Sequence, residues 1–248
     1  MLSNSEHSDT YSLRWNLAWE FALNGRYEEA LMSFDTLLIE RRSYVAISTR
    51  GLMRLMTNDL DGALEDLQEA RNLPCPPKVP VPLIGVIYWM QGSYELACED
   101  WMYEISRRRS KEVTHCDAAG GVQVPLLLWW GSIHEGLRHW RKPAEEEMKN
   151  RMRTKQGQNN WPGMVVPFLF HKMSREKLLA HASSSYPLVQ LKQQGQAQFY
   201  IAAQYLENNF EQHYLEQLSS VASEQQLITH AEYHLARYVL SESHKSAA

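Results

Sequence analysis

The chain has 248 residues, of which 44% are hydrophobic and 22% are charged. This composition is typical of a folded globular protein and excludes a largely disordered chain. The net charge of −4, from 25 basic and 29 acidic residues, gives no general attraction to nucleic acid or to an anionic membrane. We therefore expect neither of these as the partner.

The N-terminal sequence MLSNSEHSDT has neither the basic start nor the apolar run of about 7–15 residues that a signal peptide needs. No stretch of the sequence approaches the roughly 18 apolar residues of a membrane-spanning helix. Cys75, Cys98 and Cys116 are widely spaced and form no CxxC pair, which favours reduced thiols over disulfides or a zinc site. These features predict a cytoplasmic protein without membrane insertion.

A pattern repeats along the first half of the chain. Three alanines stand at intervals of 33 and 34 residues, namely Ala30, Ala63 and Ala97. A small residue precedes each by twelve positions, and a large apolar residue follows each by four. The two sets are Ala18, Gly51 and Gly85, and Phe34, Leu67 and Trp101. Because a small residue lets two helices approach and a bulky one fills the groove beside them, the spacing predicts three antiparallel helix pairs.

This pattern resembles the tetratricopeptide repeat (TPR), a helical hairpin of about 34 residues. The resemblance implies an all-α fold, a right-handed superhelix of hairpins. Gly25 and Gly92 fall at the hairpin turns, where glycine tolerates a positive φ. The expected bounds are 11–43, 44–77 and 78–109 for the repeats, 11–240 for a single domain, and 1–10 and 241–248 for flexible ends.

The second repeat departs from the pattern, because Arg50 and Arg54 stand where leucine and an aromatic residue are usual. Two explanations stay open. Either the arginines pair with carboxylates such as Glu20 or Glu29 of the preceding repeat, or the helix is rotated from this register. Pro74 closes the repeat at the expected place, which supports the register.

The regular pattern ends after residue 109. Residues 110–124 contain a Gly-Gly pair and predict a loop. An irregular middle segment of helices is expected over 125–180, and Pro125 and Pro143 should each stand in the first turn of a helix. A C-terminal hairpin and a capping helix are expected over 188–240.

The capping helix should begin at Ser223 and Gln226, which have the spacing of a capping box. It carries an apolar face with Ala231, Leu235 and Tyr238. A terminal repeat needs such a cover to remain soluble. We therefore expect this helix to close the open apolar end of the superhelix.

The C-terminal half resembles that of a bacterial TPR adaptor family that includes new lipoprotein I. The shared features are a Trp-Pro pair before an apolar stretch, a short S-x-E-x-L-L helix, an F-Y-x-A helix and a closing Ala-Arg pair. The matching residues are Trp161, Pro162, Ser174, Glu176, Leu178, Leu179, Phe199, Tyr200, Ala202, Ala236 and Arg237. The resemblance implies an adaptor that brings a client to another protein. An envelope location is not implied, because no lipid-accepting cysteine stands near the start.

Two segments carry residues with catalytic or metal-binding chemistry. HAEYH places His230 and His234 on one helical face, but Ala231 stands where the zinc-protease motif needs glutamate. We interpret both histidines as lying on the solvent side of the capping helix. The HCD triplet at 115–117 is a run of loop neighbours, and catalytic partners seldom meet that way. No nucleotide-binding or serine-hydrolase motif is present. We therefore predict no enzyme, no cofactor and no metal.

In TPR arrays the first helices of successive hairpins line a concave groove, and the resemblance implies which positions face it. These candidate binding residues are Trp15, Trp19, Leu52, Leu55, Val86 and Trp89. None is the lysine, asparagine or arginine with which related domains grip a C-terminal carboxylate. An apolar, aromatic groove favours an amphipathic helix or an apolar peptide. Alternatively, the tryptophans belong to the core, or the chain's own C-terminal helices fill the groove.

The sequence therefore predicts a non-catalytic adaptor or scaffold for protein–protein interaction. The alternative is an immunity or inhibitory protein that binds and neutralises a specific toxin or enzyme, a role that also suits a small, mildly acidic chain. An enzyme that uses the Cys116 or His230 region ranks third. Repeat architecture does not identify the partner, and the oligomeric state, including a homo-oligomer, stays open.

Overall fold

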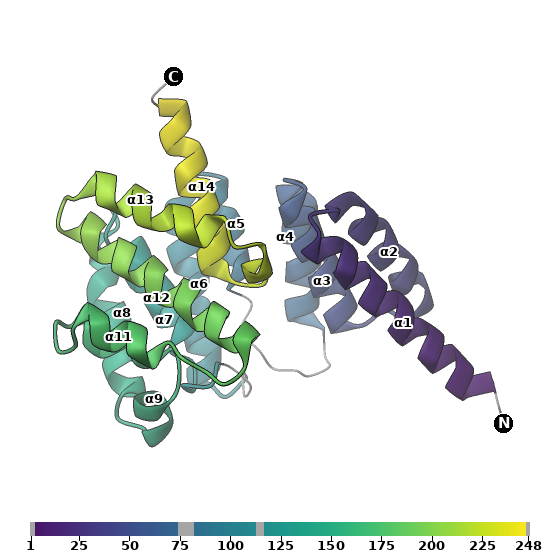
Figure 1. Ribbon diagram of the computed structural model, residues 1–248, viewed down its shortest axis with the longest axis horizontal. Coiled ribbons are helices and arrows are strands. Elements are labelled where there is room, and N and C mark those ends of the chain that lie inside the picture. Colours follow the sequence, from purple (N-terminus) through teal and green to yellow (C-terminus); the bar gives the residue numbers. More distant parts are fainter. Residues whose placement is uncertain (1–2, 74–81, 113–116, 247–248) are drawn as a thin grey trace. The chain divides into compact units, whose positions relative to one another are not determined.

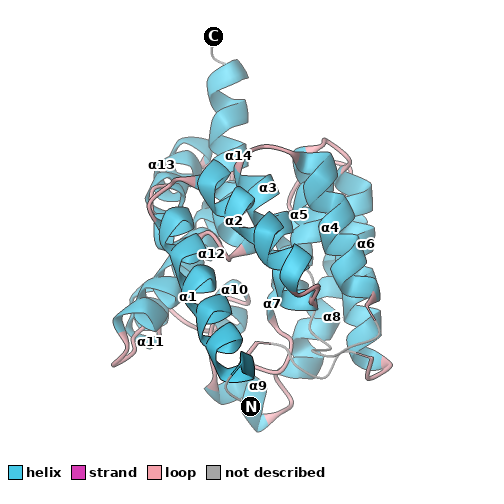
Figure 2. Ribbon diagram, turned by 90° about the vertical axis from the view of Figure 1, so that its right-hand side faces the viewer, coloured by secondary structure: helices cyan, strands magenta, loops and turns pink. Residues whose placement is uncertain are grey.

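The computed structural model describes residues 3–73, 82–112 and 117–246. Over these ranges it contains fourteen α-helices, two short 3-10 helices and no strand (Figures 1 and 2). The all-α prediction is confirmed. The expectations for Pro74, Cys75, Cys116 and His115 fall outside the described residues.

The chain divides into two compact units, Met1–Pro77 and Lys78–Ala248. We call them unit 1 and unit 2. The boundary falls between the second and third predicted repeats. The single domain expected over 11–240 stays a prediction.

Unit 1 consists of four helices in sequence, α1 (Ser3–Leu23), α2 (Tyr27–Glu40), α3 (Tyr44–Met56) and α4 (Leu60–Asn72). Each helix packs against the next along the chain (Figure 1). Local signals start two of them. Ser43 caps α3 by accepting a hydrogen bond from the Ala46 N–H, and Asp59 caps α4 through the Gly62 N–H. The pairs α1–α2 and α3–α4 are the first two predicted hairpins.

Unit 2 contains the other helices, and their bounds follow. They are α5 (Leu83–Met90), α6 (Tyr94–Arg109), α7 (Gln123–Gly131), α8 (Arg141–Arg151), α9 (Lys155–Asn159), α10 (Val165–Leu169), α11 (Arg175–His181), α12 (Pro187–Glu207), α13 (Glu211–Ala222) and α14 (Ala231–Ser246), with 3-10 turns at Arg138–Trp140 and Gln225–Leu227. Helices α5 and α6 form the third predicted hairpin, and α12 and α13 form the C-terminal one. Helix α14 packs on α13, α12 and α5 and so closes the unit (Figure 1).

One turn geometry joins the helices of four hairpins. The left-handed residues are Gly25 (φ 75°), Asn58 (φ 64°), Gly92 (φ 75°) and Asn209 (φ 63°). The N–H of the next residue donates to the carbonyl five positions earlier, at 2.9 Å in each of the pairs Arg26–Phe21, Asp59–Arg54, Ser93–Tyr88 and Phe210–Tyr205. This is the Schellman cap, which satisfies carbonyls at the helix end. The predicted positive φ at Gly25 and Gly92 is confirmed.

Gly51 and Gly85 lie where the two helices of a hairpin are in close contact. A Cβ on Gly85 would lie 2.4 Å from Nε1 of Trp101, and one on Gly51 would lie 3.1 Å from Cγ of Leu67. The Trp101 Nε1–H donates to the Pro82 carbonyl at 3.0 Å, which fixes the indole in this position. The predicted pairing of a small residue with a bulky one is therefore present in both hairpins.

Arg50 and Arg54 are paired with a carboxylate, as one of the two explanations required. Arg50 donates to both oxygens of Asp66, at 2.9 and 2.6 Å, and Arg54 lies 3.1 Å from the same carboxylate. The named partners Glu20 and Glu29 were wrong. Asp66 lies on α4, within the same hairpin. Arg50 also donates to Asp35 of α2 at 3.1 Å, so one ion pair does reach the preceding repeat, as that explanation expected.

The capping helix begins later than predicted. Gln226 belongs to the 3-10 turn Gln225–Leu227, and its N–H donates to the Glu224 side chain at 3.1 Å. Helix α14 starts only at Ala231, so Ser223 and Gln226 do not cap it. The polar spacing that identifies a capping box also suits a 3-10 turn, because both are held by short side-chain to backbone bonds.

Candidate functional site

The six candidate groove residues differ in exposure. Trp15 and Trp19 on α1 are partly exposed. Leu52 and Leu55 on α3 are buried, and so are Val86 and Trp89 on α5 of unit 2. The candidate surface therefore reduces to the two tryptophans of α1.

Trp15 and Trp19 lie one turn apart and pack edge-on against the buried Phe34 of α2. The ring centroids are 5.1 and 6.1 Å from that of Phe34, with interplanar angles of 75° and 77°. Leu23 continues the same line one turn further and is 45% exposed. We call Trp15, Trp19 and Leu23 the tryptophan stripe. Contact with Phe34 restrains each indole while part of its surface remains open, which lowers the entropy cost of binding.

Trp89 is a core residue of unit 2, so its predicted groove role does not fit. Its ring centroid lies 4.7 Å from Tyr94, 6.0 Å from Trp101, 4.6 Å from Trp130 and 4.9 Å from His134. These partners come from α6, α7 and the loop after α7. The alternative that assigned tryptophans to the core holds for this residue.

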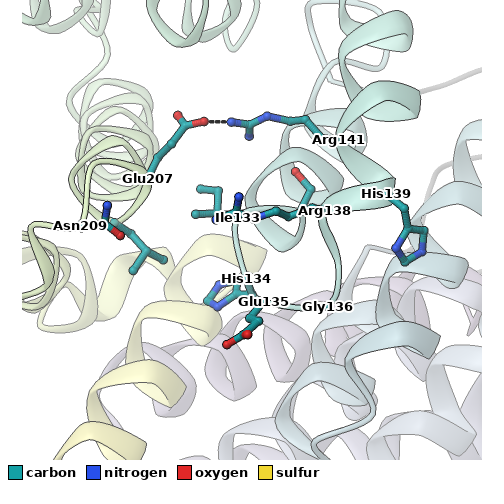
Figure 3. Close-up of a pocket in the computed structure, with 11 residues that line it drawn as sticks. Ile133, His134, Glu135, Gly136, Arg138, His139, Arg141, Glu207 and Asn209 are labelled. Atoms are coloured by element: carbon teal, nitrogen blue, oxygen red, sulfur yellow. Dashed lines mark ion pairs between the residues drawn. The ribbon is translucent and has the colours of Figure 1, made fainter.

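An open cleft of about 1030 Å³ lies in unit 2. One wall is the loop after α7 with the start of α8, and the other is the C-terminal end of α12 (Figure 3). The lining residues are Ser132, Ile133, His134, Glu135, Gly136, Arg138, His139, Arg141, Leu206, Glu207 and Asn209. Sequence reasoning missed the cleft, because its walls are distant in the chain and no motif marks either.

Arg141 and Glu207 form an ion pair across this cleft, drawn as a dashed line in Figure 3. The Arg141 guanidinium lies 4.2 Å from the centroid of Trp129 and 3.3 Å from Glu145. Burial lowers the pKa of Arg141, and Glu145 opposes that effect. A guanidinium still stays protonated in proteins, so the pair tethers α12 to α8 instead of transferring a proton.

His134 is a weak base, because its pKa is lowered. Burial against Trp89 and Trp130 lowers its pKa to about 4, so the ring is neutral. Ser132 is the one hydroxyl side chain among the lining residues, and it donates to the Trp129 carbonyl at 2.6 Å. The cleft can hold a ligand, but its lining shows no activated nucleophile of the kind that covalent catalysis needs.

Glu232 is a fully buried carboxyl group in the core of unit 2. It accepts hydrogen bonds from Gln196 Nε2 at 2.9 Å, the Tyr200 hydroxyl at 3.3 Å and Gln123 Nε2 at 3.4 Å. Burial raises the pKa of Glu232, although the hydrogen bonds act in the opposite direction. Trp161 extends the network by donating to Gln196 Oε1 at 2.7 Å. The network connects α7 and α12 to the closing helix α14.

His234 does not lie on the solvent side of the capping helix, so that interpretation was wrong for this residue, whereas His230 precedes α14 and its side chain is 20% exposed. His234 is 4% exposed, and a ring N–H donates to the Ile228 carbonyl at 2.7 Å. Burial lowers the pKa of both histidines to about 4. The first turn of α14, from Ala231 to His234, is buried, and Glu232 lies within it.

Across residues 3–73, 82–112 and 117–246, no three His, Cys, Asp or Glu side chains are grouped so that they could hold a metal ion. Nor does this part of the chain contain a helix with the length and apolarity to cross a membrane. A comparison with protein-family models finds no match, and a comparison with curated protein sequences finds no significant match.

Proposed function

We propose that the chain is a non-catalytic protein–protein interaction module, an adaptor or scaffold, with a TPR-type arrangement of hairpins. The observation that carries the proposal is the tryptophan stripe, two restrained but partly exposed indoles followed by Leu23. Tryptophans tend to dominate binding energy at protein interfaces. The expected partner is an amphipathic helix or an apolar peptide, which presents apolar side chains at matching intervals.

The C-terminal hairpin supports the TPR-type arrangement. In α12 and α13, Ala202 and Leu218 stand at the same distances from the left-handed turn as the small and bulky residues of the first three hairpins, and both are fully buried. Tyr214 replaces the alanine. Four hairpins then share one turn geometry and the packing of a small residue against a bulky one, as a repeat architecture predicts.

Replacing Trp19 by alanine tests the proposal. We expect the helical circular dichroism to persist, because part of the indole lies outside the core, and capture of the partner to be lost. The measurement is affinity capture from the native host with mass spectrometry, comparing wild type with a Trp15→Ala/Trp19→Ala bait. Ile39→Ala is the matched control, since Ile39 is 88% exposed on the neighbouring α2.

Two results would contradict the proposal. A loss of helical signal in Trp19→Ala would assign Trp19 to the core. Equal capture of every protein by wild type and by the double variant would show that no partner depends on the tryptophan stripe. In contrast, a partner retained by Ile39→Ala and lost with the double variant supports it.

A further inference from the structure

Positive charge is concentrated in one part of unit 2. Residues 138–177 contain ten lysines and arginines but four acidic residues, whereas the whole chain has 25 basic and 29 acidic residues. The large hydrophobic side chains of this segment are buried or partly exposed, and none is among the highly exposed ones. A partner that docks on this segment is therefore attracted mainly by charge.

The C-terminal end of α8 carries two of these cations on one side. Lys149 and Arg153 are four residues apart, and a tight turn prolongs the helix, because the Arg153 N–H donates to the Asn150 carbonyl at 3.2 Å. Residues at this spacing lie on the same side of a helix, and both side chains are exposed. Lys155 is exposed as well, and its Cα lies at most about 7 Å from that of Arg153.

A lysine from another element stands close to this end of α8. Lys149 Nζ lies 5.1 Å from the ring centroid of Phe170, the residue that follows α10. The left-handed His171 (φ 56°) ends α10, and the Lys172 N–H donates to the Pro167 carbonyl at 2.8 Å. This turn holds the exposed Lys172 two residues from Phe170. We call the four cations the basic surface, namely Lys149, Arg153, Lys155 and Lys172.

Two carboxylates of α8 lie near the basic surface. Glu145 accepts a hydrogen bond from Lys149 at 3.2 Å, and it also lies 3.3 Å from Arg141. Glu146 is exposed about one turn before Lys149 and bounds the surface on that side. Glu145 is therefore shared between two cations, and Glu146 is the carboxylate that a negatively charged partner would meet.

The other three cations have no partner within the protein. Among the described residues, no ion pair joins Arg153, Lys155 or Lys172 to a carboxylate. The dipole of α8 favours a cation in its last turn, as at Lys149, but its effect falls off beyond that turn. Neither ion pairing nor the helix dipole accounts for these three charges, so they are available to a partner.

We propose that the basic surface binds a short segment of another protein that is rich in aspartate or glutamate. This inference rests on the proposed function, because an adaptor that joins two proteins needs a second surface besides the tryptophan stripe. Clusters of arginine and lysine recognise acidic motifs through charge-assisted hydrogen bonds. Complementary charge of this kind sets partner choice and association rate.

Two other polyanions suit the basic surface less well. A nucleic acid extends beyond four cations, and the net charge of −4 gives the chain no general attraction to it. An anionic bilayer is held more firmly when apolar side chains insert, and residues 138–177 offer no highly exposed one. A short acidic segment needs neither feature.

The test uses the full chain and a fluorescein-labelled peptide of about eight residues, which spans at most about 28 Å when extended. The peptide alternates glutamate with serine, and its twin has glutamine in place of every glutamate. Affinity is measured by fluorescence anisotropy at low salt. We expect the glutamate peptide to bind at least about tenfold more tightly than its twin, and this affinity to fall as salt is added.

Matched variants locate the binding. Arg153→Gln/Lys155→Gln should weaken binding of the glutamate peptide about tenfold. Arg41→Gln/Lys245→Gln removes the same formal charge from exposed positions on other helices and should change the affinity by less than about twofold. Glu146→Gln should strengthen binding, because it removes the carboxylate at the edge of the basic surface. A gain of affinity cannot result from misfolding.

Three results would overturn the proposal. The first is equal affinity for the two peptides, and the second is an equal loss in the two double variants, which would make net charge the cause. The third is tighter binding of an oligothymidylate of about eight nucleotides, or of phosphatidylserine vesicles, that Arg153→Gln/Lys155→Gln abolishes. That result would assign the basic surface to nucleic acid or to a membrane.

The two proposals fail in different ways. Trp15→Ala/Trp19→Ala should keep the affinity for the glutamate peptide. If the peptide does not bind while capture still depends on the tryptophan stripe, the acidic-segment inference alone fails. If the peptide binds as expected and capture does not depend on the tryptophan stripe, the proposed function fails instead.

Discussion

Asp66 is a buried carboxylate that faces two arginines within one hairpin. Its side chain is 2% exposed, and it pairs with Arg50 and Arg54. Removing one member of a buried pair leaves uncompensated charge, which costs about 3–5 kcal/mol. We therefore expect Asp66→Ala to lower the unfolding free energy of unit 1 by about 3 kcal/mol, measured by urea denaturation.

Asp35 provides the control for this change, because it pairs with the same Arg50 at 3.1 Å but its side chain is 50% exposed. Exposed ion pairs contribute only about 0–1 kcal/mol. Asp35→Ala should therefore stay within that range. Equal losses for both variants would show that burial of Asp66 does not determine its contribution.

Glu232 is the residue of unit 2 whose ionisation opposes folding. Because burial raises its pKa above the unfolded value of 4.5, the folded state binds the proton more tightly. This contribution to stability is full below about pH 4.5 and is lost as the pH rises. Glu232→Gln removes the titration and keeps an acceptor for Gln196 and Tyr200. We expect its melting temperature to exceed that of wild type by a few degrees at pH 8 and to match it at pH 4.

Glu232→Ala is the matched control, since it leaves Gln196 and Tyr200 without their acceptor. Each buried group left unpaired costs about 1–3 kcal/mol, so this variant should melt lower than wild type at both pH values. If Glu232→Gln is as destabilised as Glu232→Ala at pH 8, the carboxylate is ionised in the fold and its hydrogen bonds outweigh its burial.

The positive φ at the hairpin turns limits which residues are stable there. Asn58 holds the position that Gly25 and Gly92 hold in the neighbouring repeats. An L-residue other than glycine pays roughly 1–2 kcal/mol in the left-handed region, and asparagine pays less than most. Asn58→Gly should therefore raise the unfolding free energy slightly, by up to about 1 kcal/mol. Gly92→Ala should lower it by about 1–2 kcal/mol, measured by urea denaturation. If Asn58→Gly lowers the unfolding free energy and Gly92→Ala raises it, the positive φ is not what determines stability at this turn position.

Sequence reasoning predicted the hairpins well because their signals are local. A glycine at the turn and a small residue at the crossing act within one hairpin, as Gly92 and Gly85 do. The start of α14 was wrong because Gln226 satisfies a short polar pattern that a 3-10 turn shares with a helix cap. Glu20 and Glu29 were wrong as partners of Arg50, which pairs instead with Asp35 of the preceding repeat and with Asp66, because an ion pair can form along several directions that spacing does not rank.

At the scale of the whole molecule, the candidate site was only partly predictable. The placement of Trp15 and Trp19 on the first helix of a hairpin follows from the repeat pattern, and both are partly exposed there. The burial of Trp89 does not, because its neighbours Trp101 and Trp130 arrive from helices whose packing the sequence pattern does not fix. The cleft beside Arg141 was missed for the same reason. Interior clusters depend on which distant segments meet, whereas a repeat pattern reports on neighbours.

One buried and two partly buried histidines in the described part of the chain predict a sensitivity to acid. Burial lowers the pKa of His134, His230 and His234 from 6.5 to about 4 in the folded state. Each unfolded histidine binds its proton near pH 6.5, so the unfolded state gains protons first as the pH falls. Stability from the neutral rings is full above about pH 6.5 and is lost progressively toward pH 4. Glu232, whose pKa is raised by burial, acts in the other direction over part of this range.

Replacing one of these rings should reduce that sensitivity. His134→Phe keeps an aromatic ring against Trp89 and Trp130 and cannot be protonated. We expect the fall in melting temperature between pH 7 and pH 4.5 to be smaller in His134→Phe than in wild type, by several degrees. His181→Gln is the control, because His181 is exposed on α11 and should leave the pH profile unchanged. If the two variants have the same profile as wild type, buried neutral histidine does not cause the acid sensitivity, and ionisation of the paired carboxylates accounts for it instead.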